Sequence, residues 1–266
     1  MKKYLTLFKL SFQQELAYPI NFVMWRIRNV IQIFLIFFLW DTVFSDPNKI
    51  AFGYDKAKIL TYVFGLVVVR PIVLSAKSFE IAGEISRGEL SNYLLKPLSY
   101  FKFWFTRDIA SKVLNILFAF FEITVLYLIL RPPFFFQIQP IYLLAFVMSL
   151  VFAIVLYSLL IFLFSMFTFW NLEQAWGFAF LLLLFTDFLG GGIIPLDVLS
   201  APIQKVINVL PFPYLLFMPL QIYLGKLSFA QTGVSLVTSG VWILILFIVV
   251  NLVWKKGIKT YKAEGK

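Results

Sequence analysis

The side chains most able to do chemistry in this chain are polar residues that interrupt long apolar runs. Asp108, Lys112, Asn115 and Glu122 recur at spacings of four, three and seven residues, so they share one face of a helix. That face could line a path for a transported molecule, or the Glu122 carboxyl could bind and release an ion. The structural alternative pairs Asp108 with Lys112 and bonds Asn115 to a neighbouring helix. We favour that alternative for Asp108 and Lys112 and leave both interpretations of Glu122 open.

Two further ionisable residues, Arg70 and Asp187, lie in other apolar runs. In a helix antiparallel to that of Glu122, Arg70 falls at a depth between Asn115 and Glu122, so we predict a buried Arg70–Glu122 ion pair. Asp187 precedes three consecutive glycines by one turn, and we predict that it caps or bonds the segment that follows rather than contacting cargo. Arg70, Asn115, Glu122 and Asp187 are therefore the candidates for a translocation path or for polar contacts inside a membrane.

The composition indicates which solvent surrounds these runs. Of 266 residues, 61% are hydrophobic and 14% are charged, and the mean hydropathy is +0.91. A soluble domain of this size could not bury so much apolar surface, so we predict an integral membrane protein in contact with lipid. The net charge of +10 is concentrated beside apolar runs, where membrane topology puts basic residues, so we predict no nucleic-acid partner.

Several chemistries are excluded by missing residue types. The chain has no cysteine and no histidine, which removes disulfides, thiol chemistry and nearly all zinc sites, so we predict no metal. It also has no G-x-x-x-x-G-K-[ST] phosphate loop for a nucleotide and no histidine to act as base for a serine. We therefore predict that this chain binds no cofactor and has no catalytic residues.

Six apolar runs, each near the length that crosses a bilayer, follow one another along the chain. The first is the weakest, because Arg26 and Arg28 must extend their side chains to the near interface. We predict one all-α transmembrane domain over residues 1–266, preceded within it by an amphipathic interfacial helix in residues 1–18. The six predicted spans are residues 22–44, 58–77, 108–130, 141–169, 175–194 and 234–254.

Lysine and arginine near the ends of the spans predict the orientation of the chain. Fifteen of these residues lie in the N-terminal stretch, in the segment 76–107 and in the C-terminal tail, against six in the three loops on the other side. We therefore predict that both termini and the segment 76–107 are cytoplasmic. The even number of spans agrees with that orientation.

The cytoplasmic segment 76–107 has the pattern of a helix, a break and a second helix. Residues 76–87 have helical spacing, and Gly88 supplies a left-handed position that ends a helix at low cost. The second helix would turn Leu90, Tyr93 and Leu94 to one apolar face and stop at Lys96-Pro97.

The segment 190–226 on the other side is mostly apolar but contains three consecutive glycines and five prolines. So many breaks prevent one continuous helix from crossing there. We predict short re-entrant helices that dip into the outer leaflet and return. A separate seventh span is the alternative.

The order of these elements resembles the membrane subunit of an ABC-2 type ABC transporter. Residues 84–98, EISRGELSNYLLKPL, are similar to the Glu, Gly, Leu-Leu and Pro pattern in the second cytoplasmic segment of that family. Residues 210–213, LPFP, followed by Pro219 and Gly225, and the tail 254–261 further resemble a bacterial subgroup of permeases. The resemblance covers nearly the whole chain but is almost silent about cargo.

The resemblance implies a permease that forms the translocation path as a dimer, with an identical or homologous second permease. Two copies of a separate ATP-binding subunit, which hold the ATP and Mg, would power export across a bacterial cytoplasmic (inner) membrane. They would dock on a coupling helix in the segment 76–107. The coupling residues implied are Glu80, Glu84, Arg87, Gly88, Glu89, Leu90, Lys96 and Pro97.

A carrier driven by an ion gradient is the alternative function. It would use the carboxyls of Glu122 and Asp187, since ionisable groups inside spans are costly and usually functional. A carrier of that kind does not by itself explain a structured cytoplasmic helix, break and helix.

Overall fold

The computed structural model describes residues 2–17, 19–46 and 48–261. In that part of the chain all regular elements are helical, apart from one isolated bridge between Ala51 and Tyr54. The all-α prediction is therefore confirmed. Lys262 and Lys266, which were counted for the orientation, lie outside the described residues.

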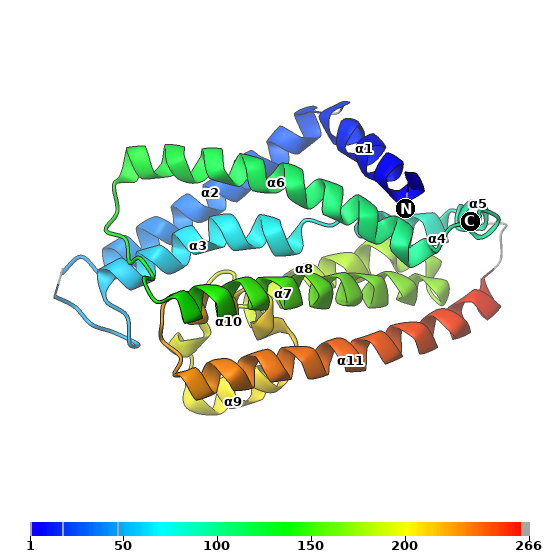
Figure 1. Ribbon diagram of the computed structural model, residues 1–266. Helices are drawn as coiled ribbons and strands as arrows, with labels where there is room; N and C mark the ends of the chain where they lie inside the picture. The colour runs from blue at the N-terminus through cyan, green and yellow to red at the C-terminus, as the bar shows by residue number, and fades with distance from the viewer. Residues whose placement is uncertain (1, 18, 47, 262–266) are drawn as a thin grey trace.

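The longer helices run side by side as a bundle (Figure 1). Within the described residues, five helical stretches are long and apolar enough to cross a membrane: Lys56–Leu74, Tyr100–Leu130, Pro140–Phe169, Leu172–Leu189 and Phe229–Thr260. The bundle helices are α2 (Pro19–Val43), α3 (Lys56–Leu74), α6 (Tyr100–Leu130), α7 (Pro140–Met166), α8 (Ala175–Leu189) and α11 (Phe229–Thr260). Among these bundle helices, only α2 is not one of the five stretches that are long and apolar enough to cross a membrane.

Several helix ends differ from the predicted ones, each for a local reason. Helix α6 begins at Tyr100, because its first aromatic side chains pack into a buried cluster; the predicted segment 76–107 therefore includes its first two turns. Helix α11 begins at Phe229, since Ser228 and Gln231 form a capping box there. Helix α8 already ends at Leu189, and Gly191 beyond it has φ of +78°.

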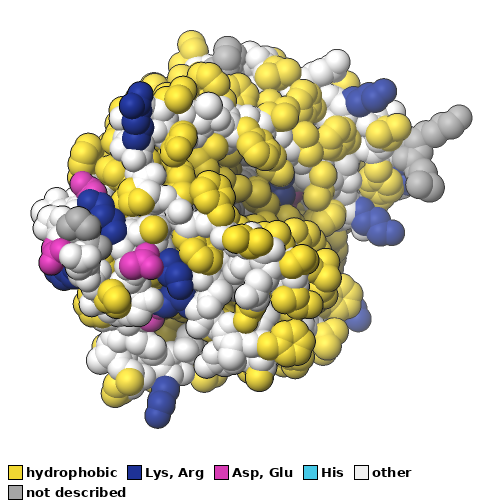
Figure 2. Space-filling model, turned by 60° about the vertical axis from the view of Figure 1, so that its left-hand side comes forward, with side chains coloured by type: hydrophobic (Ala, Val, Ile, Leu, Met, Phe, Trp, Pro, Cys, Tyr) yellow, Lys and Arg dark blue, Asp and Glu magenta, His cyan; other side chains and the backbone are white. Residues whose placement is uncertain are grey.

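Helix α3 lies at the centre of the bundle, packed against α2, α6 and α7. Its side chains are buried almost throughout, from Ile59 to Val73. The outer flanks of α2, α6, α8 and α11 instead expose many large apolar side chains. Figure 2 shows apolar side chains over most of the visible surface, with many of the charged ones gathered toward its left-hand side. This distribution suits a bundle whose solvent is lipid.

Short helices make up the two predicted irregular segments. Between α3 and α6 lie η1 (Lys77–Phe79), α4 (Glu80–Ser86) and α5 (Ser91–Leu94). Residues 190–226 contain η4 (Leu196–Val198), α9 (Ala201–Val209), η5 (Phe212–Tyr214) and α10 (Phe217–Tyr223). The longest of these four has nine residues, too few to cross a bilayer, so the alternative of a seventh span is wrong.

The N-terminal helix α1 (Lys2–Ala17) leaves the bundle direction and packs against the beginning of α6 (Figure 1). Phe8 and Phe12 of this helix are partly buried, whereas Leu5 and Leu16 are exposed. A helix with apolar side chains on its free side is suited to a membrane surface.

Candidate functional site

The connection between α3 and α6 folds into a compact unit at the same end of the bundle as the end of α11 (Figure 1). Gly88, with φ of +74°, separates α4 from α5. The Glu89 amide then donates to the Glu84 carbonyl at 2.9 Å, and the Gly88 amide to the Ile85 carbonyl at 3.3 Å. These bonds satisfy the last carbonyls of α4, so the predicted break at Gly88 is confirmed.

An apolar cluster fixes this unit to the bundle. Ile81, Ile85 and Leu90 are fully buried with Trp104 of α6 and Met166 of α7. The predicted shared face of the second helix is wrong in part. Leu94 is 45% exposed, because α5 has only four residues and cannot carry a continuous apolar stripe.

Two buried charged residues of α6 hold the start of this unit. The Asp108 carboxylate accepts hydrogen bonds from the backbone amides of Lys77 (2.6 Å) and Ser78 (2.9 Å) and from the Ser78 hydroxyl. The Lys112 ammonium donates to the backbone carbonyls of Val73 (2.8 Å) and Ser75 (2.6 Å). Both residues are therefore structural, as favoured above, but they bind the end of α3 and the start of η1 instead of forming a simple pair.

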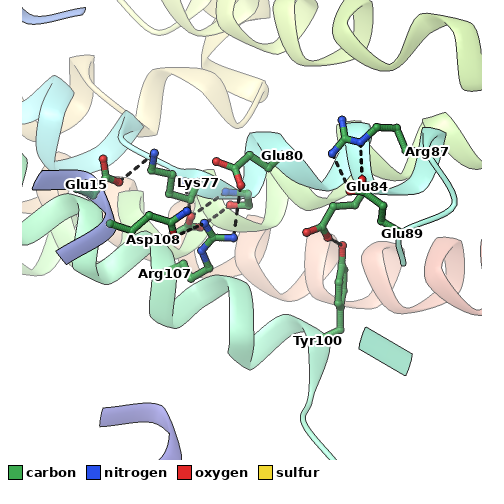
Figure 3. Close-up of polar contacts among 11 residues, drawn as sticks. Glu15, Lys77, Glu80, Glu84, Arg87, Glu89, Tyr100, Arg107 and Asp108 are labelled. Atoms are coloured by element: carbon green, nitrogen blue, oxygen red, sulfur yellow. Dashed lines mark hydrogen bonds and ion pairs between the residues drawn. The ribbon is translucent and has the colours of Figure 1, made fainter. Parts of the chain in front are cut away.

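A cleft of about 400 Å³ opens between α1 and this unit. Two ion pairs lie among the residues that line it: Arg107 with Glu80 at 3.4 Å, and Arg87 with Glu89 at 2.8 Å (Figure 3). Its lining residues are Leu7, Leu10, Ser11, Gln14, Glu80, Glu84, Arg87, Glu89, Tyr93, Phe103 and Arg107. The cleft therefore offers both charges and some apolar surface to a partner.

The implied coupling residues divide into three groups in the structure. Four of them line the cleft, and Gly88 and Leu90 shape the unit beneath it. Lys96 and Pro97 lie beyond α5, where the Lys96 ammonium is 5.0 Å from the Tyr93 ring centroid. The Lys3 ammonium donates to the Pro97 carbonyl at 3.0 Å, which ties α1 to the same unit. The four cleft residues are Glu80, Glu84, Arg87 and Glu89.

Glu84 is the most buried acid of this cleft, at 4% exposed. Its carboxylate accepts a hydrogen bond from the Tyr100 hydroxyl at 2.8 Å (Figure 3). Burial raises the pKa of Glu84 above its ordinary value of 4.5, against the opposing effect of hydrogen bonds from Tyr93 and Tyr100. Burial therefore makes the Glu84 carboxyl harder to ionise than a solvent-exposed glutamate.

This raised pKa predicts a pH dependence of stability. A carboxyl whose pKa is raised on folding stabilises the folded state most below its unfolded pKa, and that contribution is lost as pH rises through the folded value. Glu84→Gln keeps a carbonyl acceptor for Tyr100 but cannot ionise. We expect its melting temperature in detergent, relative to the wild type, to rise as pH increases from 4.5 to neutrality.

Glu89→Gln is the matched control, since Arg87 holds the pKa of Glu89 below its ordinary value. A lowered pKa contributes stability above the unfolded pKa, so this variant should lose stability relative to the wild type as pH rises. Equal pH trends for the two variants would contradict the role assigned to burial of Glu84.

Inside the bundle, the charged residues pair differently from the prediction. Glu122 of α6 forms an ion pair with Arg26 of α2, whose Nε donates to it at 2.6 Å. Arg70 of α3 instead pairs with Asp187 of α8. The predicted Arg70–Glu122 pair is therefore wrong, because α2 brings a second arginine beside α6. The predicted interhelix bond of Asn115 is confirmed: its Oδ1 accepts from Arg26 Nη1 at 3.2 Å.

Arg26 is the residue that sequence reasoning missed. Its side chain does not extend to the interface but is buried, with the residue 7% exposed. The signal was present in the sequence, since Arg26 lies about one turn inside the predicted span 22–44 and a carboxylate elsewhere needed a partner. The Asp187 carboxylate binds Arg70, and Arg70 Nη1 in turn donates to the Gly192 carbonyl at 3.3 Å. The predicted link from Asp187 to the following segment is thus made through Arg70.

Within the described residues, no group of three or more His, Cys, Asp or Glu side chains is placed to hold a metal ion.

Comparison with known proteins identifies the family of this chain. A search of curated proteins finds no significant match. A family model described as "ABC-2 family transporter protein" matches residues 30–265, nearly the whole chain.

Proposed function

We propose that this chain, which belongs to the ABC-2 family of transporter proteins, is the transmembrane subunit of an ATP-driven exporter. It is a multi-pass membrane protein of a family whose membrane subunits are typically non-catalytic. The observation that carries the proposal is the cleft of about 400 Å³ beside α4, beyond the inner end of α3. A separate ATP-binding subunit needs such a structured, charged surface to transmit its movement.

The proposed architecture has six spans. In addition to the five candidate spans, α2 would cross the membrane as the first span of the chain. It has 25 residues and therefore a length of about 37 Å at about 1.5 Å per residue, enough to cross the hydrocarbon core. Its Arg26 is compatible with lipid because Glu122 neutralises it. Both termini and the unit of η1, α4 and α5 would be cytoplasmic, α1 would lie at the inner interface, and residues 190–226 would be re-entrant in the outer leaflet.

The proposed partners are two ATP-binding subunits and a second permease, identical or homologous. Each ATP-binding subunit, holding ATP and Mg, would dock on the α4–α5 unit and on α1. Leu94 and Leu95 support this, because they are 45% and 87% exposed beside charged residues. Exposed apolar side chains inside a polar rim are typical of a protein-binding surface. The proposed location is a bacterial cytoplasmic membrane.

The carrier alternative loses support from the charge pairing. A proton or sodium carrier needs an intramembrane carboxyl that binds and releases its ion. Glu122 and Asp187 are each paired with an arginine, Arg26 and Arg70 respectively. Each arginine already occupies the oxygens to which a proton or sodium ion would have to bind, so it competes with such an ion.

Single cysteines test this arrangement, because the native chain has none. Asn48, Lys205 and Asn92 are exposed positions in the α2–α3 loop, in α9 and in α5. In intact cells, an impermeant maleimide should label Asn48→Cys and Lys205→Cys but not Asn92→Cys. In inside-out vesicles the pattern should reverse.

The same labels test docking. Adding the ATP-binding subunit to inside-out vesicles should protect Asn92→Cys from labelling while Lys259→Cys, exposed near the end of α11, stays accessible. Labelling of Asn92→Cys from outside would overturn the orientation. Unchanged labelling of Asn92→Cys in a complex that still co-purifies would overturn the docking surface.

A further inference from the structure

The turn Gly190–Gly192, at the start of the segment 190–226, is bound by one helix of the bundle. The Tyr62 hydroxyl of α3 donates to the Gly191 carbonyl at 2.6 Å. Arg70, two turns further along α3, donates to the Gly192 carbonyl at 3.3 Å and pairs with Asp187 just before the turn. Helix α3 thus contacts the turn at two levels.

The turn also has no room to move independently of its neighbours. A Cβ atom on Gly191 would come within 2.6 Å of the Tyr62 hydroxyl and 2.9 Å of Cβ of Phe217 in α10. The Phe217 amide donates to the Gly190 carbonyl at 3.0 Å. The turn is therefore packed between α3 and α10, and a shift of α3 along its axis displaces both the turn and α10.

At its C-terminal end α3 is joined to the proposed docking unit. Only Ser75 and Ala76 separate α3 from η1. Lys112 binds the carbonyls of Val73 and Ser75, and Asp108 binds the first amides of η1, so this junction is not a loose linker. A buried helix with polar attachments both to the turn and to the docking unit is a physical route by which one site can bias the other.

We propose that Arg70 is a positioning residue that makes the Gly190–Gly192 turn, and with it the segment 190–226, follow movements of α3. The ion pair suits this task because separating Arg70 from Asp187 would leave two uncompensated charges among apolar helices. The hydrogen bond of Tyr62 adds a second, uncharged attachment. This inference rests on the proposed function, in which ATP-driven movement enters at α4.

Hydrogen exchange tests the proposal without knowledge of the cargo. The full permease, assembled with its ATP-binding subunits in lipid nanodiscs, is compared without nucleotide and after trapping with Mg-ATP and orthovanadate. In the wild type, amide exchange should change in residues 77–99 and in residues 190–226. In Arg70→Met, the change in 77–99 should persist, while that in 190–226 should shrink at least about five-fold, the lower end of typical coupling between sites.

Arg26→Met is the matched control. It also removes the arginine of a buried ion pair, with Glu122, but does not touch the turn. It should keep both exchange responses, and Arg70→Lys, which retains the charge, should keep more of the 190–226 response than Arg70→Met. If Arg70→Met does not assemble, Tyr62→Phe replaces it and should reduce the 190–226 response.

The outcomes separate this inference from the function on which it rests. An undiminished 190–226 response in Arg70→Met, or in Tyr62→Phe as its replacement, overturns the role of this attachment. An equal loss in Arg26→Met also overturns it, because the effect would then be a general consequence of a broken pair. A wild type whose residues 77–99 ignore ATP contradicts the proposed function itself and removes the basis of the inference.

Discussion

Gly88→Val should leave the chain inserted in the membrane but lower permease-dependent ATP hydrolysis at least about tenfold. Gly88 has φ of +74°, a conformation in which a β-branched side chain is strained by about 1–3 kcal/mol. Valine would shift the backbone between α4 and α5 and break the bond from the Glu89 amide to the Glu84 carbonyl. Because the spans do not depend on this break, expression and labelling at Asn48 should be unchanged.

Gly240→Val provides the matched control. Gly240 lies in α11, and a Cβ atom there would meet nothing within 4 Å, so valine fits without strain. ATP hydrolysis by this variant should equal that of the wild type. Wild-type activity in a well-expressed Gly88→Val protein would show that the shape of the α4–α5 unit does not matter for coupling. The replacement Glu84→Lys should uncouple in the same way, since it places an ammonium in a carboxylate site that is 4% exposed.

Glu122→Gln should lower the stability of the permease by about 3–5 kcal/mol and still leave ATP as the driving force. The change leaves Arg26 charged, in a side chain that is only 8% exposed, without its ion-pair partner. A thermal melt in detergent measures the loss. Transport-coupled ATP hydrolysis, corrected for the folded fraction, should persist.

The double variant Arg26→Met/Glu122→Gln is the control for the stability term, because it removes both charges together. It should recover much of the stability lost by Glu122→Gln, since two uncharged side chains of similar size can replace a buried pair at little cost. If the double variant loses as much stability as the two single variants lose together, the interaction between Arg26 and Glu122 contributes little.

Features set by local backbone requirements could be predicted from the sequence. The break at Gly88 follows from a glycine placed where a helix must end, and the structure has a left-handed residue there. The helical bundle follows from apolar runs of spanning length. The capping box at Ser228 was present in the sequence as Ser followed three residues later by Gln, but the predicted start of α11 relied on hydropathy alone.

Features set by neighbours in space could not be predicted. Depth along a helix suggested Arg70 as the partner of Glu122, but depth does not say which helices touch, and α2 supplies Arg26 instead. The cleft depends on α1 folding back against α6, which no periodicity in either helix specifies. Leu94 was assigned to a buried face that a four-residue helix does not have.

The central claim is that ATP hydrolysis by a partner, not an ion gradient, powers this chain. The most direct test reconstitutes the wild-type chain with its ATP-binding subunit in liposomes made permeable to protons and sodium. We expect the chain to raise ATP hydrolysis above that of the ATP-binding subunit alone, and Gly88→Val to remove the increase. The opposite result would be ATP hydrolysis that is the same with and without the chain, together with proton flux through the chain after an imposed pH step in sealed liposomes. That result would show a carrier driven by an ion gradient.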